Sequence, residues 1–113
     1  PNKIGIMPVR TIGQGCFFQN RVIKSVTIPD NVKIIEDDAF LMCENLESVK
    51  AKEIQIIGHS AFLKDYRLKD VDLGEHLERI SSYSFFCCEA LKYIPYSKEL
   101  KTLGSYAFGG GAV

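Results

Sequence analysis

The sequence has no excess of charge of either sign and no long hydrophobic run. Its 113 residues carry 14 lysines and arginines against 14 aspartates and glutamates, so the formal net charge is zero. Proteins that bind nucleic acid without sequence specificity carry a basic excess, so the balance argues against a nucleic-acid partner. The longest apolar runs, such as Ala39 to Cys43, have about five residues, whereas a membrane-spanning helix needs about 20. We therefore predict no transmembrane segment.

Motifs for catalysis and export are also missing. The first ten residues, PNKIGIMPVR, contain no hydrophobic signal core, so a signal for export would lie outside this sequence. No G-x-S-x-G nucleophile elbow occurs, and the glycines at 109–111 are not followed by the Lys-Ser/Thr of a phosphate-binding loop. His59 and His76 have no recurring acid–base partner, so we interpret both as surface residues without a catalytic role. We predict that the chain is not an enzyme and holds no cofactor.

What the sequence does contain is a repeat of 22 to 23 residues that runs through nearly the whole chain. A phenylalanine recurs at this spacing, with a small residue immediately before it and an aliphatic residue five positions earlier. These phenylalanines are Phe17, Phe40, Phe62, Phe85 and Phe108, and we predict that they form the structural core. Self-similarity at such a period is typical of solenoids, in which each unit packs on its neighbours.

Each unit is predicted to contain two short extended segments and one turn. The segments 26–28, 49–51 and 71–73 alternate apolar and polar residues, which indicates strands with one buried face. A second extended segment is expected in 32–35, 54–57, 77–80 and 100–103. The small residue and the Phe should then form a single helical turn. Units stacked one strand spacing apart, ~4.8 Å, would share one continuous core.

Two stretches, SVTIPDNVKIIEDDAFLMCENLESV and HLERISSYSFFCCEALKYI, closely resemble the BspA-like (Treponema pallidum-type) leucine-rich repeat family. The family pattern is roughly L-x-x-I-x-I-P-x-x-V-x-x-I-G-x-x-A-F-x-x-C-x-x-L. Positions that match its glycine and cysteine are Gly13, Gly58, Gly104, Cys43 and Cys88, whereas Glu36, Ser81, Asn20 and Asp65 depart from it. The resemblance implies a β-rich leucine-rich-repeat solenoid: a right-handed coil with parallel strands on one face and short extended and helical-turn segments on the other.

The resemblance also implies a non-catalytic protein-binding module of a surface or secreted protein, of the kind implicated in adhesion. Carbohydrate is a second ligand class. The alternatives are a structural spacer or stalk, and a repeat domain appended to an enzyme encoded elsewhere in a longer chain. Neither end of residues 1–113 resembles a polar capping unit. We therefore expect one solenoid segment of about five units within a longer array, with end-to-end self-association open to its uncapped ends.

The four cysteines are predicted to be free thiols. Cys43 and Cys88 share a column of the repeat but lie two units apart, ~9.6 Å, which exceeds disulfide reach. Cys16 takes the small core position before Phe17, and the neighbours Cys87 and Cys88 could bridge only with strain. A redox role is the less favoured reading, and a metal site is less favoured still because no C-x-x-C pair exists.

The outward positions of the first strand column vary from unit to unit. They are Ser25 and Thr27, then Ser48, Lys50 and Lys52, then Asp70 and Asp72, then Tyr93 and Pro95. In-register strands would place Lys50 beside Asp72 and a basic row beside an acidic one. The simpler interpretation is solvated charges that pair weakly. The functional interpretation is a mixed-charge ligand-binding face formed by Ser48, Lys50, Lys52, Asp70, Asp72 and Tyr93.

Overall fold

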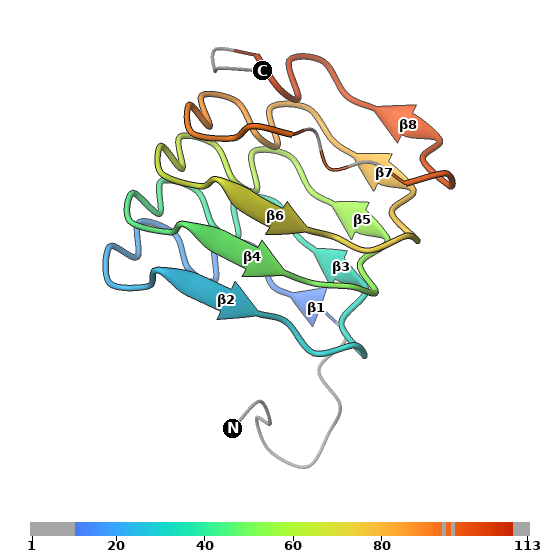
Figure 1. Ribbon diagram of the computed structural model, residues 1–113, viewed down its shortest axis with the longest axis horizontal. Helices are drawn as coiled ribbons and strands as arrows, with labels where there is room; N and C mark the ends of the chain where they lie inside the picture. Colours follow the sequence, from blue (N-terminus) through green and yellow to red (C-terminus); the bar gives the residue numbers. More distant parts are fainter. Residues whose placement is uncertain (1–10, 94, 96, 110–113) are drawn as a thin grey trace.

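The computed structural model describes residues 11–93, 95 and 97–109, and in it the chain coils into two parallel sheets (Figure 1). The five-stranded sheet contains β1 (Thr11–Ile12), β3 (Ile34–Ile35), β5 (Ile56–Ile57), β7 (Arg79–Ile80) and β8 (Thr102–Leu103). The three-stranded sheet contains β2 (Ser25–Thr27), β4 (Ser48–Lys50) and β6 (Asp70–Asp72). Successive strands of each sheet come from successive units, which confirms the predicted solenoid.

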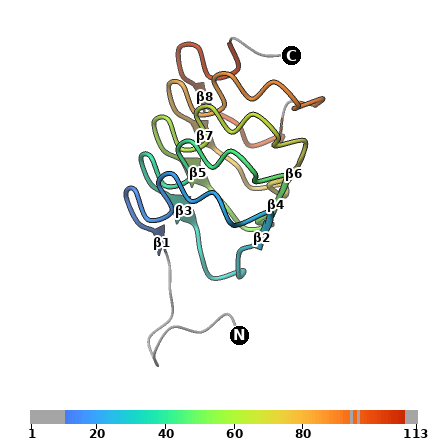
Figure 2. The ribbon, with the colours of Figure 1, turned by 90° about the vertical axis from the view of Figure 1, so that its left-hand side faces the viewer.

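The two sheets form opposite walls of the coil (Figure 2). The turns that contain the core phenylalanines join them along one edge, here called the turn edge, and the polar turns join them along the other (Figure 1). Every strand pair is parallel and stays in the register that the repeat predicts. Val26 is opposite Val49, and Val49 is opposite Val71. In the other sheet Ile35 is opposite Ile57, and Ile57 is opposite Ile80. Columns of equivalent residues therefore stack along the solenoid axis, and the inner ones become the core.

The expected helical turn before each Phe is wrong: the described residues contain no helix. The segment is instead a series of hydrogen-bonded turns, with two residues per unit at positive φ. In the second unit these are Asp38 and Met42, both at φ 59°. Alternate N–H groups then point along the axis: Asp38, Phe40 and Met42 donate to carbonyls of the next unit at 3.0, 2.8 and 2.8 Å. A helix would direct all these donors to its own carbonyls, so the stacking ladder selects the turn.

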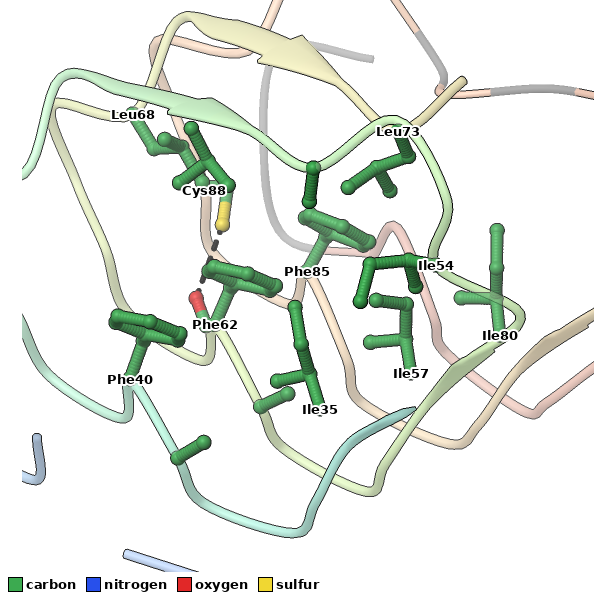
Figure 3. Close-up of a cluster of buried hydrophobic side chains, with 14 of the residues drawn as sticks. Ile35, Phe40, Ile54, Ile57, Phe62, Leu68, Leu73, Ile80, Phe85 and Cys88 are labelled. Atoms are coloured by element: carbon green, nitrogen blue, oxygen red, sulfur yellow. Dashed lines mark hydrogen bonds between the residues drawn. The ribbon is translucent and has the colours of Figure 1, made fainter. Parts of the chain in front are cut away.

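The core is a continuous stack of phenylalanine rings. Phe40 and Phe62 are both 0% exposed, with ring centroids 5.2 Å apart and an interplanar angle of 1°. Phe85 continues the stack at 5.0 Å from Phe62 (Figure 3). Phe17 and Phe108 stack at its two ends and are only partly buried. The predicted core is confirmed, and the partial exposure of the end rings follows from having a described neighbour on one side only.

Among the described residues the three-stranded sheet ends at β6 and includes no strand of the fifth unit. Pro95, expected to point outward, is buried, and no strand is assigned at 93 and 95. Pro95 takes the place that Lys50 and Asp72 hold in the strands before it. A proline has no N–H, so position 95 cannot donate a backbone hydrogen bond to β6. Positions 94 and 96 of the predicted pattern lie outside the described residues.

The 22-residue unit has its own structural signature. Its polar turn has only Lys52 and Glu53, where the units on either side have three residues, and the Lys52 carbonyl lies against Gly74 of the next unit. A Cβ on Gly74 would lie 1.9 Å from that oxygen, and Gly74 has φ +72°. Glycine is therefore required at position 74, both for the space and for the backbone conformation.

Candidate binding surface

The strand face is the outward side of β2, β4 and β6, together with Tyr93 of the following unit. The register aligns Ser25 with Ser48 and Asp70, and Thr27 with Lys50 and Asp72. These side chains alternate with the inward valines because successive residues of a strand point to opposite faces. All of them are exposed except Ser48, which is partly buried.

A shallow groove of about 510 Å³ runs over this face. Five of the six predicted site residues line it, namely Ser48, Lys50, Asp70, Asp72 and Tyr93. The structure does not bring Lys52 into the groove, because the residue follows the end of β4 and enters the polar turn. Lys52 lines a neighbouring hollow of about 280 Å³ with Glu53, Glu75 and His76, and Asp72 borders both.

Sequence reasoning missed three other lining residues, Ser25, Thr27 and Lys69, as members of the site. Ser25 and Thr27 were placed on the face but not assigned to the site, because a hydroxyl alone carries little chemical signal. Lys69 immediately precedes β6, outside the two outward positions that the strand alternation marks. A cation placed directly before Asp70 was the signal that could have identified it.

The charged side chains of the strand face form no ion pairs with described residues. Lys50 lies opposite Asp72, but no lysine–carboxylate contact within 4.0 Å joins them. The ion pairs among the described residues involve Arg21, Lys33, His76 and Lys101, all outside the groove. Lys50, Lys69, Asp70 and Asp72 thus present both signs of charge to solvent within one groove.

Tyr93 is the aromatic residue of this surface. Its side chain is 79% exposed, and none of the ring contacts among the described residues involves it. The other exposed tyrosines of the last two units differ in this respect. Tyr83 and Tyr106 stack on each other at 5.4 Å and flank Phe86 at the turn edge.

The histidines occupy the surface, as the sequence predicted. His59 and His76 are both exposed. His76 Nδ1 lies 3.1 Å from Glu99 Oε2, a residue one unit further along the solenoid. Within the described ranges no three histidine, cysteine or carboxylate side chains form a group that could hold a metal.

The four cysteines are free and occupy different environments. Cys16 is exposed, so its predicted core position is wrong. Ala39 and Ala61, the equivalent residues of the next two units, are buried and each have a described unit before them, whereas Cys16 has no described turn before it. Cys43 and Cys88 are buried, and their thiols donate to the carbonyls of Phe17 and Phe62, both at 3.1 Å. Figure 3 shows the bond from Cys88 to Phe62. Burial raises the pKa of both thiols, so each is a protonated donor near neutral pH.

Asp65 occupies the same column between these two cysteines. Its side chain is 0% exposed; Oδ1 accepts a hydrogen bond from the Cys43 N–H at 2.8 Å, and Oδ2 has no partner. Burial raises the pKa of Asp65 to about 9, so the carboxyl is neutral at pH 7. The sequence marked position 65 only as a departure from the cysteine column and gave no signal that the carboxyl would be buried.

A search for membrane-spanning helices among the described residues found none that is long and apolar enough.

Comparison with solved structures gives two close likenesses in fold. A leucine-rich repeat protein from Bacteroides ovatus ATCC 8483 is 26% identical with a TM-score of 0.72, over 78% of this chain and 26% of that protein. A leucine rich cell surface protein from Faecalibacterium prausnitzii A2-165 is 24% identical with a TM-score of 0.67, over 100% of this chain and 38% of its own length. The chain therefore spans well under half of either protein.

Comparison with curated proteins found no significant match. The family model of the BspA type leucine rich repeat region matches residues 3–112 in six copies. Together with the in-register parallel strands and the phenylalanine stack, this match shows that the chain belongs to the BspA type leucine-rich repeat family.

Proposed function

We propose that the chain is a non-catalytic protein-binding module whose partner contacts the strand face. The observation that carries the proposal is the groove over β2, β4 and β6, where unpaired charges of both signs lie beside an exposed tyrosine. Aromatic residues supply much of the affinity of protein interfaces, and charges act mainly on orientation and association rate. The strand face contains both kinds of residue.

The module is proposed to act in a surface or secreted protein. The cell-surface description of the Faecalibacterium neighbour and the family membership support this placement. The array would extend beyond residues 1–113, consistent with the larger size of the neighbours. A structural spacer is the competing function, and it predicts no dependence of any binding on the groove residues.

A matched pair of triple variants tests the proposal. A protein partner is first isolated with the immobilised chain, and its affinity for each purified variant is then measured by calorimetry. The strand-face variant combines Lys50→Glu, Asp72→Lys and Tyr93→Ala. The control variant, Lys64→Glu with Glu89→Lys and Tyr106→Ala, makes the same chemical changes at exposed residues that do not line the groove.

We expect the strand-face variant to bind about 30-fold more weakly or worse, because removal of an aromatic hot spot costs ~2 kcal/mol or more. The control variant should bind as the unmodified protein does. Equal binding by the strand-face variant and the unmodified protein would contradict the proposal. A protein that retains no partner at all would favour the spacer.

A further inference from the structure

The buried column that contains Asp65 shows a recurring hydrogen-bonding pattern with a gap at Asp65. The carbonyls of Phe17 and Phe62 each accept an N–H from their own turn and a side-chain thiol from the next unit. Phe17 O accepts from Asn20 N at 3.0 Å and Cys43 Sγ at 3.1 Å. Phe62 O accepts in the same way from Asp65 N at 3.2 Å and Cys88 Sγ at 3.1 Å.

The gap lies between the second and third units. Phe40 O accepts the N–H of Cys43 at 3.3 Å, but no side chain of the described residues donates to it. The residue that should supply the second donor, by its place in the column, is Asp65. The Oδ2 atom of Asp65 is buried and has no partner, so an unfilled acceptor coincides with an unpartnered carboxyl oxygen.

We propose that Asp65 is a proton-dependent lock between the second and third units. In the folded protein Oδ1 accepts the Cys43 N–H, and a proton on Oδ2 is donated to the Phe40 carbonyl. When this proton is lost to solvent, the buried carboxylate has no donor for its second oxygen, and the two units separate more readily. The carboxyl thus takes the place of the thiol donors Cys43 and Cys88, and it can donate a hydrogen bond only while it is protonated.

The surroundings of Asp65 are consistent with a neutral carboxyl. The titratable groups whose pKa Asp65 affects are the thiol of Cys43 from the preceding unit and the thiol of Cys88 from the following unit. Both thiols are neutral near pH 7, and no lysine, arginine or histidine in the described part of the chain pairs with Asp65. Apart from the Cys43 N–H, the described residues supply no donor or cation that would stabilise a carboxylate here.

The sign of the pH effect follows from linkage. The folded-state pKa of about 9 exceeds the ordinary value of 3.8, so the folded protein binds this proton more tightly than the unfolded chain does. The stabilisation is fully present below pH ~4 and is lost as the pH rises through ~9. Within this window the unfolding equilibrium constant should rise by up to about tenfold per pH unit on account of Asp65 alone.

Urea unfolding from pH 5 to pH 8 tests the lock in the unmodified protein, Asp65→Asn and Asp65→Cys. Asparagine mimics the protonated acid, because its oxygen can accept from Cys43 and its amide can donate to Phe40. Cysteine restores the residue of the column. We expect the ratio of the unfolding constants, unmodified protein over Asp65→Asn, to rise steeply with pH, and Asp65→Cys to follow Asp65→Asn.

An infrared spectrum provides a second readout that does not depend on stability. At pH 7 the unmodified protein should show a carboxylic acid C=O band that is absent from Asp65→Asn and from Asp65→Cys. A ratio of unfolding constants that stays flat from pH 5 to pH 8 would overturn the proposal. The absence of that band at pH 7 would overturn it as well, even if one variant failed to fold.

Discussion

The phenylalanine stack and the strand face are built from the same repeats but differ in how strictly they repeat. Five successive units place a phenylalanine in the stack, with centroids 5.0 to 5.2 Å apart along the whole series. The column of Thr27 continues as Lys50 and Asp72 on the strand face and then as the buried Pro95. Core packing restricts the residue type in the phenylalanine stack, whereas it does not restrict the residue type in the column of Thr27. A partner could therefore be recognised on the strand face without changing the core.

The largest effect on stability is expected from a substitution that removes a ring from the middle of the phenylalanine stack. Phe62→Ala should lower the free energy of unfolding by ~3–5 kcal/mol, because the ring is fully buried between two others. Phe108→Ala is the matched control, since that ring stacks on one described neighbour and is partly exposed. Urea unfolding should show a clearly smaller loss for Phe108→Ala. Equal losses would mean that the stack is not the shared core of the units.

A glycine substitution tests how closely the units approach at the end of the strand face. Gly74→Ala places a Cβ against the Lys52 carbonyl at a residue with positive φ, and should cost ~2–4 kcal/mol through overpacking and backbone strain. Gly13→Ala is the control, because a Cβ there meets no atom within 4 Å. Thermal unfolding of the two variants measures the difference. A Gly74→Ala protein as stable as Gly13→Ala would rule out the close contact of the short turn.

At the turn edge, the effect of a substitution on stability should depend on backbone conformation rather than on side-chain packing. Lys64 is exposed and has φ 62°, a conformation that β-branched residues strongly disfavour. Lys64→Val should therefore cost ~1 kcal/mol, whereas Lys64→Asn should leave stability unchanged or slightly higher. Chemical denaturation of both variants provides the measurement. If valine were tolerated as well as asparagine, the turn would be closer to the helical turn that the sequence suggested.

The smallest effect on stability is expected on the strand face. Lys50→Glu and Tyr93→Ala should each change the free energy of unfolding by less than ~0.5 kcal/mol, because these side chains are exposed and make no ion pair. Asp72→Lys should cost ~1 kcal/mol, because Asp72 Oδ1 accepts the Gly74 N–H at 3.1 Å. Denaturation of the single variants checks this. A loss of several kcal/mol from any of them would show that the strand face supports the fold and is not free to vary.

The sequence predicted the features that depend on the repeat period. It did not predict the features that depend on contacts with the backbone of a neighbouring unit. The stack and the register of Lys50 with Asp72 follow from spacing alone. The turn could not be predicted, because Met42 carries no signal for positive φ and Asp38 carries only the weak preference of aspartate. The conformation of both residues is accompanied by N–H groups that bond to the next unit. The burial of Pro95 and the exposure of Cys16 likewise depend on what covers each residue, which the repeat pattern does not specify.

The same limit applies to the candidate surface. Alternation of strand residues identified the outward positions, but the groove ends before Lys52 and includes Lys69. Both differences come from the point where a strand passes into a turn, which is set by hydrogen bonding rather than by the hydrophobic pattern. For Asp65, the sequence shows that a polar residue occupies the cysteine column. It does not show that the carboxyl is protonated, because this depends on its burial.

The claim that the strand face makes the contact is tested most directly by site-specific photocrosslinking. A photoreactive phenylalanine analogue replaces Tyr93 in one protein and Tyr106 in another, and each is irradiated with the isolated partner. Both positions are exposed aromatic residues, at 79% and 65%, but only Tyr93 lines the groove. Our account predicts a crosslinked product from position 93 and none from position 106. Crosslinking from position 106 alone would contradict it and assign recognition to the turn edge.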